Sequence, residues 1–272
     1  AVCARAGSRR QREGPPSSQH LPRLSFATWV GGDRDGHPLV TAEVTRTTLH
    51  DLRQHGLNLL RSRLTALAQQ LSLSDLLQAP PASLMDKLNA LVELLGADAQ
   101  PALGRNPDEP WRQYVNLLIT RLPVSAEQVP TGFTYRTAAE LEQDLRGLYD
   151  SLMGLGATRL ANADVLPVIR LTQVFGFHLA ALDIRQNSRF HELALAQLLT
   201  AAGLDGADFP DWDEERRLAF LEQELNTCRP FTLPGMQLGP EAETVLSCYR
   251  VLADYIDRFG SAGLGSLIIS MT

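Results

Sequence analysis

Hydrophobic residues recur at helical spacing along most of the chain. The clearest case is "TAAELEQDLRGLYDSLMGLG", where Thr137 and Glu140 have the spacing of a capping box and leucines follow every three or four residues until Gly156. Similar patterns cover residues 164–176, 188–203, 211–225 and 245–260, and the stretch from about 40 to 121 with breaks near "APPAS" and "GRNPDEP". The chain is therefore predicted to be mostly α-helical.

Polar residues mark where several of these helices are expected to begin. Asp164, Ser188 and Asp211 each precede a periodic segment and are predicted N-caps. Pro167 is expected in the first turn of the helix that Asp164 opens, where a proline is tolerated.

Three short apolar runs interrupt the helical pattern and are predicted to be strands. They read "FATWV" (26–30), "FHLAALDI" (177–184) and "SLIIS" (266–270), and polar or charged residues follow each run. Parallel strands are buried on both faces, and ligands bind at their carboxyl ends, so charges are expected there. We therefore predict one parallel sheet with Arg34, Arg185 and Thr272 at the same end.

Composition narrows the class of protein. The 272 residues carry a net charge of −6, which gives little electrostatic support for binding a nucleic-acid backbone. No apolar run approaches the roughly 20 residues that span a bilayer. The three cysteines lack metal-site or disulfide spacing, which fits a reducing, cytoplasmic compartment. Residues 1–22 are expected to be a disordered or non-homologous tail, and residues 23–272 a domain.

The polar strand exits admit a functional and a structural interpretation. The "DRDG" sequence at Asp33, Arg34 and Asp35 suits a ligand site or a surface turn. Arg185 suits a phosphate or carboxylate clamp beside a helix N-terminus, or an ion pair with Asp183. His191 precedes a glutamate but lacks the second histidine of a zinc-protease motif, so an exposed helix histidine is expected.

Three longer segments resemble one enzyme family. "FATWVGGDRDGHPLVTAEVT" is similar to a segment of phosphoenolpyruvate carboxylases, with His37 in place of the usual asparagine. "FGFHLAALDIRQNSRFHE" resembles the Asp-Ile-Arg-Gln segment of that family, and "LIISMT" resembles its Ile-Ser-Met strand. The segments occur in family order, and the similarity runs from about residue 24 to 272.

The resemblance implies a helix-rich protein built around a TIM-like α/β barrel with eight strands. The implied reaction converts phosphoenolpyruvate and bicarbonate to oxaloacetate and phosphate, with Mg²⁺ or Mn²⁺ in the complete enzyme. By position, Arg185 matches a family arginine that contacts the substrate phosphate, and Asp33, Arg34 and Asp35 would line or brace the active-site end. A homo-oligomer is implied for the complete protein. Many relatives carry a basic residue where this sequence has Ala181.

Other parts of the family pattern have no counterpart in this sequence. They are the catalytic histidine of an upstream Thr-Ala-His-Pro-Thr segment, the metal carboxylates, the active-site lysine and the Gly-Arg-Gly-Gly loop. We therefore expect an interior fragment that contains no metal ligands and is inactive by itself. Two alternatives stay open, namely a non-catalytic helical scaffold or binding module, and another barrel enzyme that acts on phosphorylated substrates.

Overall fold

The computed structural model describes residues 22, 24–227, 230–233 and 235–271. Most of them are helical, as the hydrophobic spacing predicts. The elements, in chain order, are β1 (Ala27–Thr28), α1 (Ala42–Gln70), α2 (Ala82–Leu95), η2 (Gly96–Ala99), α3 (Gln100–Gly104), α4 (Pro110–Arg121), α5 (Ala138–Gly154), α6 (Thr158–Leu160), η3 (Ala161–Val165), α7 (Leu166–Phe175), β2 (Ala181–Asn187), α8 (Ser188–Ala201), η4 (Phe209–Asp211), α9 (Glu214–Leu225), α10 (Pro240–Phe259), η5 (Ser261–Gly263) and β3 (Leu264–Ser270).

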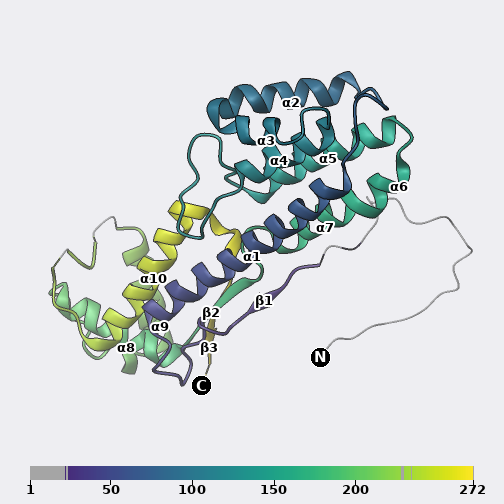
Figure 1. Cartoon of the computed structure of the whole chain (residues 1–272). Helices are drawn as coiled ribbons and strands as arrows, with labels where there is room; N and C mark the ends of the chain where they lie inside the picture. The colour runs from purple at the N-terminus through teal and green to yellow at the C-terminus, as the bar shows by residue number, and fades with distance from the viewer. Residues whose placement is uncertain (1–21, 23, 228–229, 234, 272) are drawn as a thin grey trace, which may run out of the picture.

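The long helix α1 joins the two halves of the molecule. Helices α2 to α7 gather around one half of α1, and the sheet lies beside the other half with α8, α9 and α10 (Figure 1). Leu57, Leu60, Leu64 and Leu67 recur on one face of α1 and are buried in the helical half. Earlier in the same helix, Leu49 belongs to a second cluster with β2 and α10. A single helix therefore fixes the sheet relative to the helical half.

The three predicted strands form one parallel sheet in the order β1-β2-β3, which confirms that part of the prediction. Ala181 pairs with Ala27 on one side, and Arg185 pairs with Ile268 on the other. β2 is therefore the central strand, and it is the most buried of the three. Among the described residues the sheet is open, so the barrel implied by the resemblance stays a proposal for the complete protein.

Several helix starts differ from the predicted ones. Asp164 is no N-cap, because the chain is already helical from Thr158 and widens into a π-helical turn at Ala161–Val165. This wider turn directly precedes Pro167, which has no N–H to donate to the turn before it. The helix still ends at Gly176, as predicted.

Two further caps lie one or two residues from the predicted residue. Asn187 caps α8 in place of Ser188, and Asp213 caps α9 in place of Asp211. In both cases the capping residue has extended backbone, which lets its side chain reach the N–H groups of the first turn. At α5 the predicted capping box does not form, because the side chain of Thr137 accepts no bond from the helix backbone and Glu140 accepts instead from the N–H of Arg136 and the hydroxyl of Thr137.

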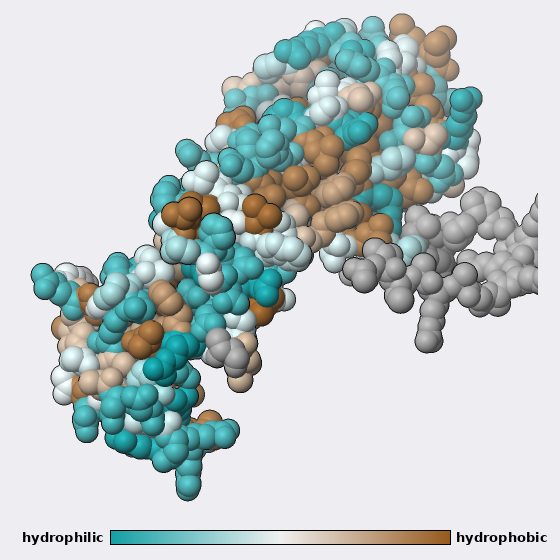
Figure 2. Space-filling view, turned by 90° about the horizontal axis from the view of Figure 1, so that it is seen from below, coloured by the Kyte–Doolittle hydropathy of each residue, from teal (hydrophilic) through white to brown (hydrophobic). Residues whose placement is uncertain are grey.

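Hydrophobic side chains are also exposed, in a broad patch across the middle of the face in Figure 2. No helix in the described part of the chain is long and apolar enough to cross a membrane. The predictions for residues 1–21, including a disordered tail, lie outside the described residues.

Candidate active-site end of the sheet

The polar exits of the three strands meet at one end of the sheet, as predicted. Arg185 lies near the end of β2, and its backbone N–H donates to the carbonyl of Gly32 at 3.0 Å. The N–H of Arg34 donates to the carbonyl of Arg185 at 2.9 Å. Thr272 lies outside the described residues, but Ser270 marks the end of β3 at the same place. The loop after β1 thus continues the sheet beyond the short strand itself.

Two glycines allow this loop to follow β2 so closely. Gly31 has a φ of +85°, a conformation that residues with a side chain rarely adopt, and it turns the chain after Trp29. A Cβ atom on Gly32 would lie 2.1 Å from the carbonyl oxygen of Asp183. The two residues that end "FATWVGG" are therefore glycine for different reasons.

Asp33 and Asp35 connect the loop to both neighbouring strands. One carboxylate oxygen of Asp33 pairs with Nη1 of Arg185 at 3.2 Å, and the other accepts from the backbone N–H of Asp35 at 3.0 Å. The hydroxyl of Ser270 donates to Asp35 at 2.6 Å. The two aspartates therefore hold the ends of β2 and β3 to the loop.

Arg34 points away from these carboxylates and is buried. Only 6% of its surface is exposed, and its guanidinium donates to the carbonyls of Gly32 and Thr41 and to the hydroxyl of Thr45. The Thr45 hydroxyl in turn donates to the carbonyl of Gly31 at 2.7 Å. Arg34 thus fastens the loop to the start of α1. Thr45 and Ser270 are not apparent from the sequence, because both are paired only through the tertiary fold.

Arg185 keeps free hydrogen-bonding capacity at this end. Its ion-pair partner is Asp33, and not Asp183, which instead accepts from the N–H of Ser266 on β3. The Nε atom of Arg185 is buried and has no hydrogen-bond partner in the described part of the protein. About a third of the side chain is exposed. A guanidinium with one carboxylate partner and unused donors is suited to bind an oxyanion.

His191 is not the exposed helix residue that we expect from the sequence. It is half-buried, its ring stacks on Tyr249 with centroids 6.3 Å apart, and its Nε2 atom has no described partner. Burial lowers its pKa. It lines a small cavity of about 10 Å³ together with Arg34 and Gln186, behind the strand ends. The helix pattern places His191 on α8 but does not show that α10 covers it.

The acidic residues at this end do not form a metal site. Asp33 and Asp35 are occupied by Arg185 and Ser270, and no cluster of histidine, cysteine or acidic residues in the described ranges is suited to hold a metal ion.

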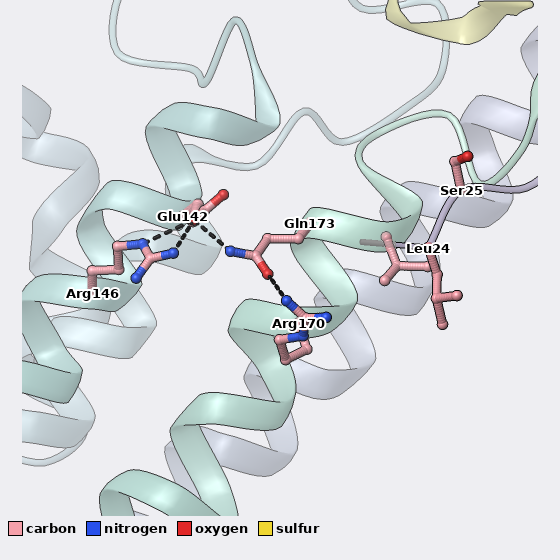
Figure 3. Close-up of a pocket in the computed structure, with 7 residues that line it drawn as sticks. Leu24, Ser25, Glu142, Arg146, Arg170 and Gln173 are labelled. Carbon is pink, nitrogen blue, oxygen red and sulfur yellow. Dashed lines mark hydrogen bonds and ion pairs between the residues drawn. The ribbon is translucent and has the colours of Figure 1, made fainter. Parts of the chain in front are cut away.

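Cavities larger than the one beside His191 lie elsewhere in the described part of the protein. The one in Figure 3 shows that volume alone does not identify a ligand site. It measures about 440 Å³ and lies between α5, α7 and the segment before β1. Its polar groups bond to each other in a chain from Arg146 through Glu142 and Gln173 to Arg170 (Figure 3). Arg170 also donates to the carbonyl of Pro22. These groups are therefore bonded mainly to one another and to the backbone.

Comparison with known proteins agrees with the three motifs. The family model described as phosphoenolpyruvate carboxylase matches residues 8–272, and so begins inside the stretch 1–22. Phosphoenolpyruvate carboxylase of Rhodopseudomonas palustris (strain BisA53) is 35% identical over 258 residues, which are 92% of this chain and 27% of that protein. The enzyme of Azorhizobium caulinodans is 34% identical over 273 residues, 96% of this chain and 28% of its own.

The enzyme of Mycolicibacterium paratuberculosis is 36% identical over 261 residues, again 92% of this chain and 27% of that protein. The chain therefore spans about a quarter of the length of these relatives. With the match over nearly all of its residues and with the three motifs placed at one end of a parallel sheet, this chain belongs to the phosphoenolpyruvate carboxylase family.

Proposed function

We propose that this chain is part of an enzyme that converts phosphoenolpyruvate and bicarbonate to oxaloacetate and phosphate, and that Arg185 binds the phosphate of the substrate. The observation that carries the proposal is the state of Arg185 at the carboxyl end of β2. Its guanidinium is oriented by Asp33 and partly exposed, and its Nε atom is unused.

In the proposed reaction, the phosphoryl group of phosphoenolpyruvate moves to a bicarbonate oxygen, which gives carboxyphosphate and the enolate of pyruvate. The carboxyl group then joins the enolate carbon and phosphate leaves. The phosphoryl oxygens carry negative charge in the substrate, in carboxyphosphate and in the transition states between them. A positioned guanidinium therefore stabilises all of these species, and it speeds the reaction if it fits a transition state best. Arg185 supplies this contact, while Asp33 and the Gly31–Asp35 loop set its direction.

A divalent cation, Mg²⁺ or Mn²⁺, belongs to the proposal for the complete protein, where it would stabilise the enolate. The residues described here do not fit such an ion, since both loop aspartates have partners. Its ligands, the catalytic histidine and the general base would come from parts of the complete protein that this chain does not include. Oligomerisation of the complete protein likewise stays a prediction.

The test is kinetic and needs the complete protein. Arg185→Gln is expected to lower kcat/KM for phosphoenolpyruvate at least about 100-fold, or about 2.7 kcal/mol of transition-state stabilisation. Arg250→Gln, on the exposed face of α10, is the matched control and should change kcat/KM less than about twofold. Oxaloacetate is measured by coupling to malate dehydrogenase and following NADH. A change under about threefold for Arg185→Gln would make this arginine structural.

The same assay separates a catalytic part from a scaffold. The isolated 272-residue chain is expected to give no oxaloacetate above the enzyme-free background. If the complete protein is also inactive while correctly folded, the non-catalytic scaffold is the better description.

A further inference from the structure

A second cavity lies at the opposite end of the sheet from Arg185. It measures about 80 Å³ and is bounded by α1, the start of α5, the turn before β2 and the end of α10. The residues that matter for its chemistry are Arg53, Arg136, Thr137, His178 and Tyr255. His178 lies just before the first residue of β2, whereas Arg185 lies near the last residue of that strand. The two sites are therefore at different ends of the same strand.

Arg53 is a buried cation without a carboxylate. It is 3% exposed, its Nε donates to the carbonyl of Ala126 at 3.1 Å, and its Nη2 has no hydrogen-bond partner among the described residues. No ion pair joins it to an acidic residue in that part of the chain. Arginine does not lose its proton in proteins, so the charge must be stabilised in place.

Aromatic contacts account for only part of that stabilisation. The guanidinium lies 4.3 Å from the ring centre of Phe259 and 6.0 Å from that of Phe177. Cation–π contacts of this kind offset only part of the free-energy cost of burying a charge. A structural role through Ala126 and the two rings therefore leaves the Nη2 donors unexplained.

The remaining walls of the cavity are also suited to an anion. Arg136 is exposed at its mouth, and the 17-residue helix α5 begins there at Ala138. The side chain of the N-cap residue Thr137 accepts no bond from the first turn, and its hydroxyl donates to Glu140. The N–H groups of that turn and the positive end of the helix dipole are thus available to a ligand.

The fold places His178 in this cavity for a steric reason. Residues 177–179 pass so close to α1 that a Cβ atom on Gly56 would lie 3.1 Å from the backbone nitrogen of Leu179. This contact brings His178 beside Arg53, and burial together with the charge of Arg53 lowers the His178 pKa. A neutral histidine next to a buried cation is consistent with a region of positive potential.

We propose that this cavity binds a small tetrahedral oxyanion, either free phosphate or the phosphoryl group of a metabolite, between Arg53, Arg136 and the N-terminus of α5. The volume of about 80 Å³ is several times the roughly 10–15 Å³ that holds one water, so the cavity has room for a single small oxyanion group. The acidic residue of this turn, Glu140, does not line the cavity and bonds to the N–H of Arg136 and the hydroxyl of Thr137. The proposal does not depend on the proposed function, because Arg185 takes no part in it.

The first test measures binding of inorganic phosphate to the 272-residue chain by calorimetry. Arg136→Gln removes an exposed side chain and is expected to leave folding intact while weakening one class of phosphate site at least about tenfold. Arg185→Gln should leave that class unchanged. Arg146→Gln, an exposed arginine on α5, is the control for a general loss of charge. Equal binding by Arg136→Gln and the original chain, or loss of all binding in Arg185→Gln, would overturn the proposal.

The second test uses the buried cation itself. Arg53→Met keeps an unbranched but shorter side chain and removes the charge, so the variant should lose the rise in unfolding midpoint that phosphate gives the original chain. If phosphate stabilises Arg53→Met as much as the original, the proposal is wrong. If the variant does not fold, the Arg136→Gln result decides. Repeating the titration with glycerol 3-phosphate distinguishes the two sources, since tighter binding than phosphate indicates a metabolite and weaker binding indicates the free ion.

Discussion

Gly32 shows how a single residue without a side chain sets the geometry of the strand ends. The atom that a Cβ would meet, the carbonyl oxygen of Asp183, belongs to the backbone of the central strand. It cannot move aside as a flexible side chain would. The two backbone hydrogen bonds between the loop and Arg185 flank this close approach. A side chain at position 32 would push the loop away from β2 and so would also displace Asp33 from Arg185.

Gly32→Ala is therefore expected to lower the free energy of unfolding by at least about 2 kcal/mol, the cost of overpacking against an immobile neighbour. Gly154→Ala is the control, because that residue ends α5, has no positive φ and has no atom within 4 Å of the place that a Cβ would take. There the substitution should be neutral or mildly stabilising. Urea unfolding followed by circular dichroism measures both, and equal effects would contradict the steric argument.

At the scale of elements, Asp144 of α5 holds α4 and the loop after it. Its carboxylate accepts from Nη1 of Arg121 at 2.7 Å and from the hydroxyl of Tyr135 at 2.6 Å. Its backbone carbonyl accepts from the hydroxyl of Tyr114 at 3.2 Å. Burial and the nearby Asp144 charge raise the pKa of Tyr135 well above its usual value, so its hydroxyl remains a donor.

Asp144→Ala leaves the Arg121 charge and the Tyr135 hydroxyl without their shared acceptor. We expect a loss of about 2 kcal/mol in the free energy of unfolding, as for a hydrogen bond to a charged group with limited solvent access. Asp150→Ala, at an exposed position of the same helix, should change it by less than about 0.5 kcal/mol. Thermal or urea unfolding of the two variants measures these free energies. A similar loss of stability in both variants would show that the loss comes from changing any aspartate of α5, and not from the contacts of Asp144.

At the scale of the whole molecule, one edge of the sheet is uncovered in the described structure. β3 is an edge strand, and its Leu267 and Ile269 are half exposed although they lie in a strand. Unpaired strand edges with apolar side chains favour association between chains. The isolated chain is thus expected to self-associate through this edge.

Replacing both Leu267 and Ile269 by lysine should reduce this association, because charged edge residues oppose strand pairing. The control replaces Leu76 and Leu77 by lysine as well. These two residues are more exposed than Leu267 and Ile269 but lie in the loop between α1 and α2. Size-exclusion chromatography over a range of concentrations measures the change. If both double variants elute like the original chain, association does not use the β3 edge.

Much of the architecture follows from local patterns in the sequence. Helical spacing of leucines predicts α5 and α10, and the apolar runs with late charges predict three parallel strands with Arg185 at their carboxyl end. These features depend on side-chain periodicity and on the high cost of burying a charge inside a strand, both of which are properties of short segments. The family motifs are likewise contiguous in the chain.

The partners of the polar side chains were decided only by the tertiary structure. Arg185 pairs with Asp33 from a loop more than 150 residues earlier, while Asp183, two residues away in β2, points toward β3. His191 is covered by α10, and Arg53 is buried where α1 meets a turn and a helix end from distant parts of the chain. Hydrogen bonds and burial depend on distance in space, whereas sequence patterns report only neighbours along the chain. For this reason the sequence by itself determined the elements and the polar end of the sheet, and only the folded chain determined which charges are paired and which are left to bind a ligand.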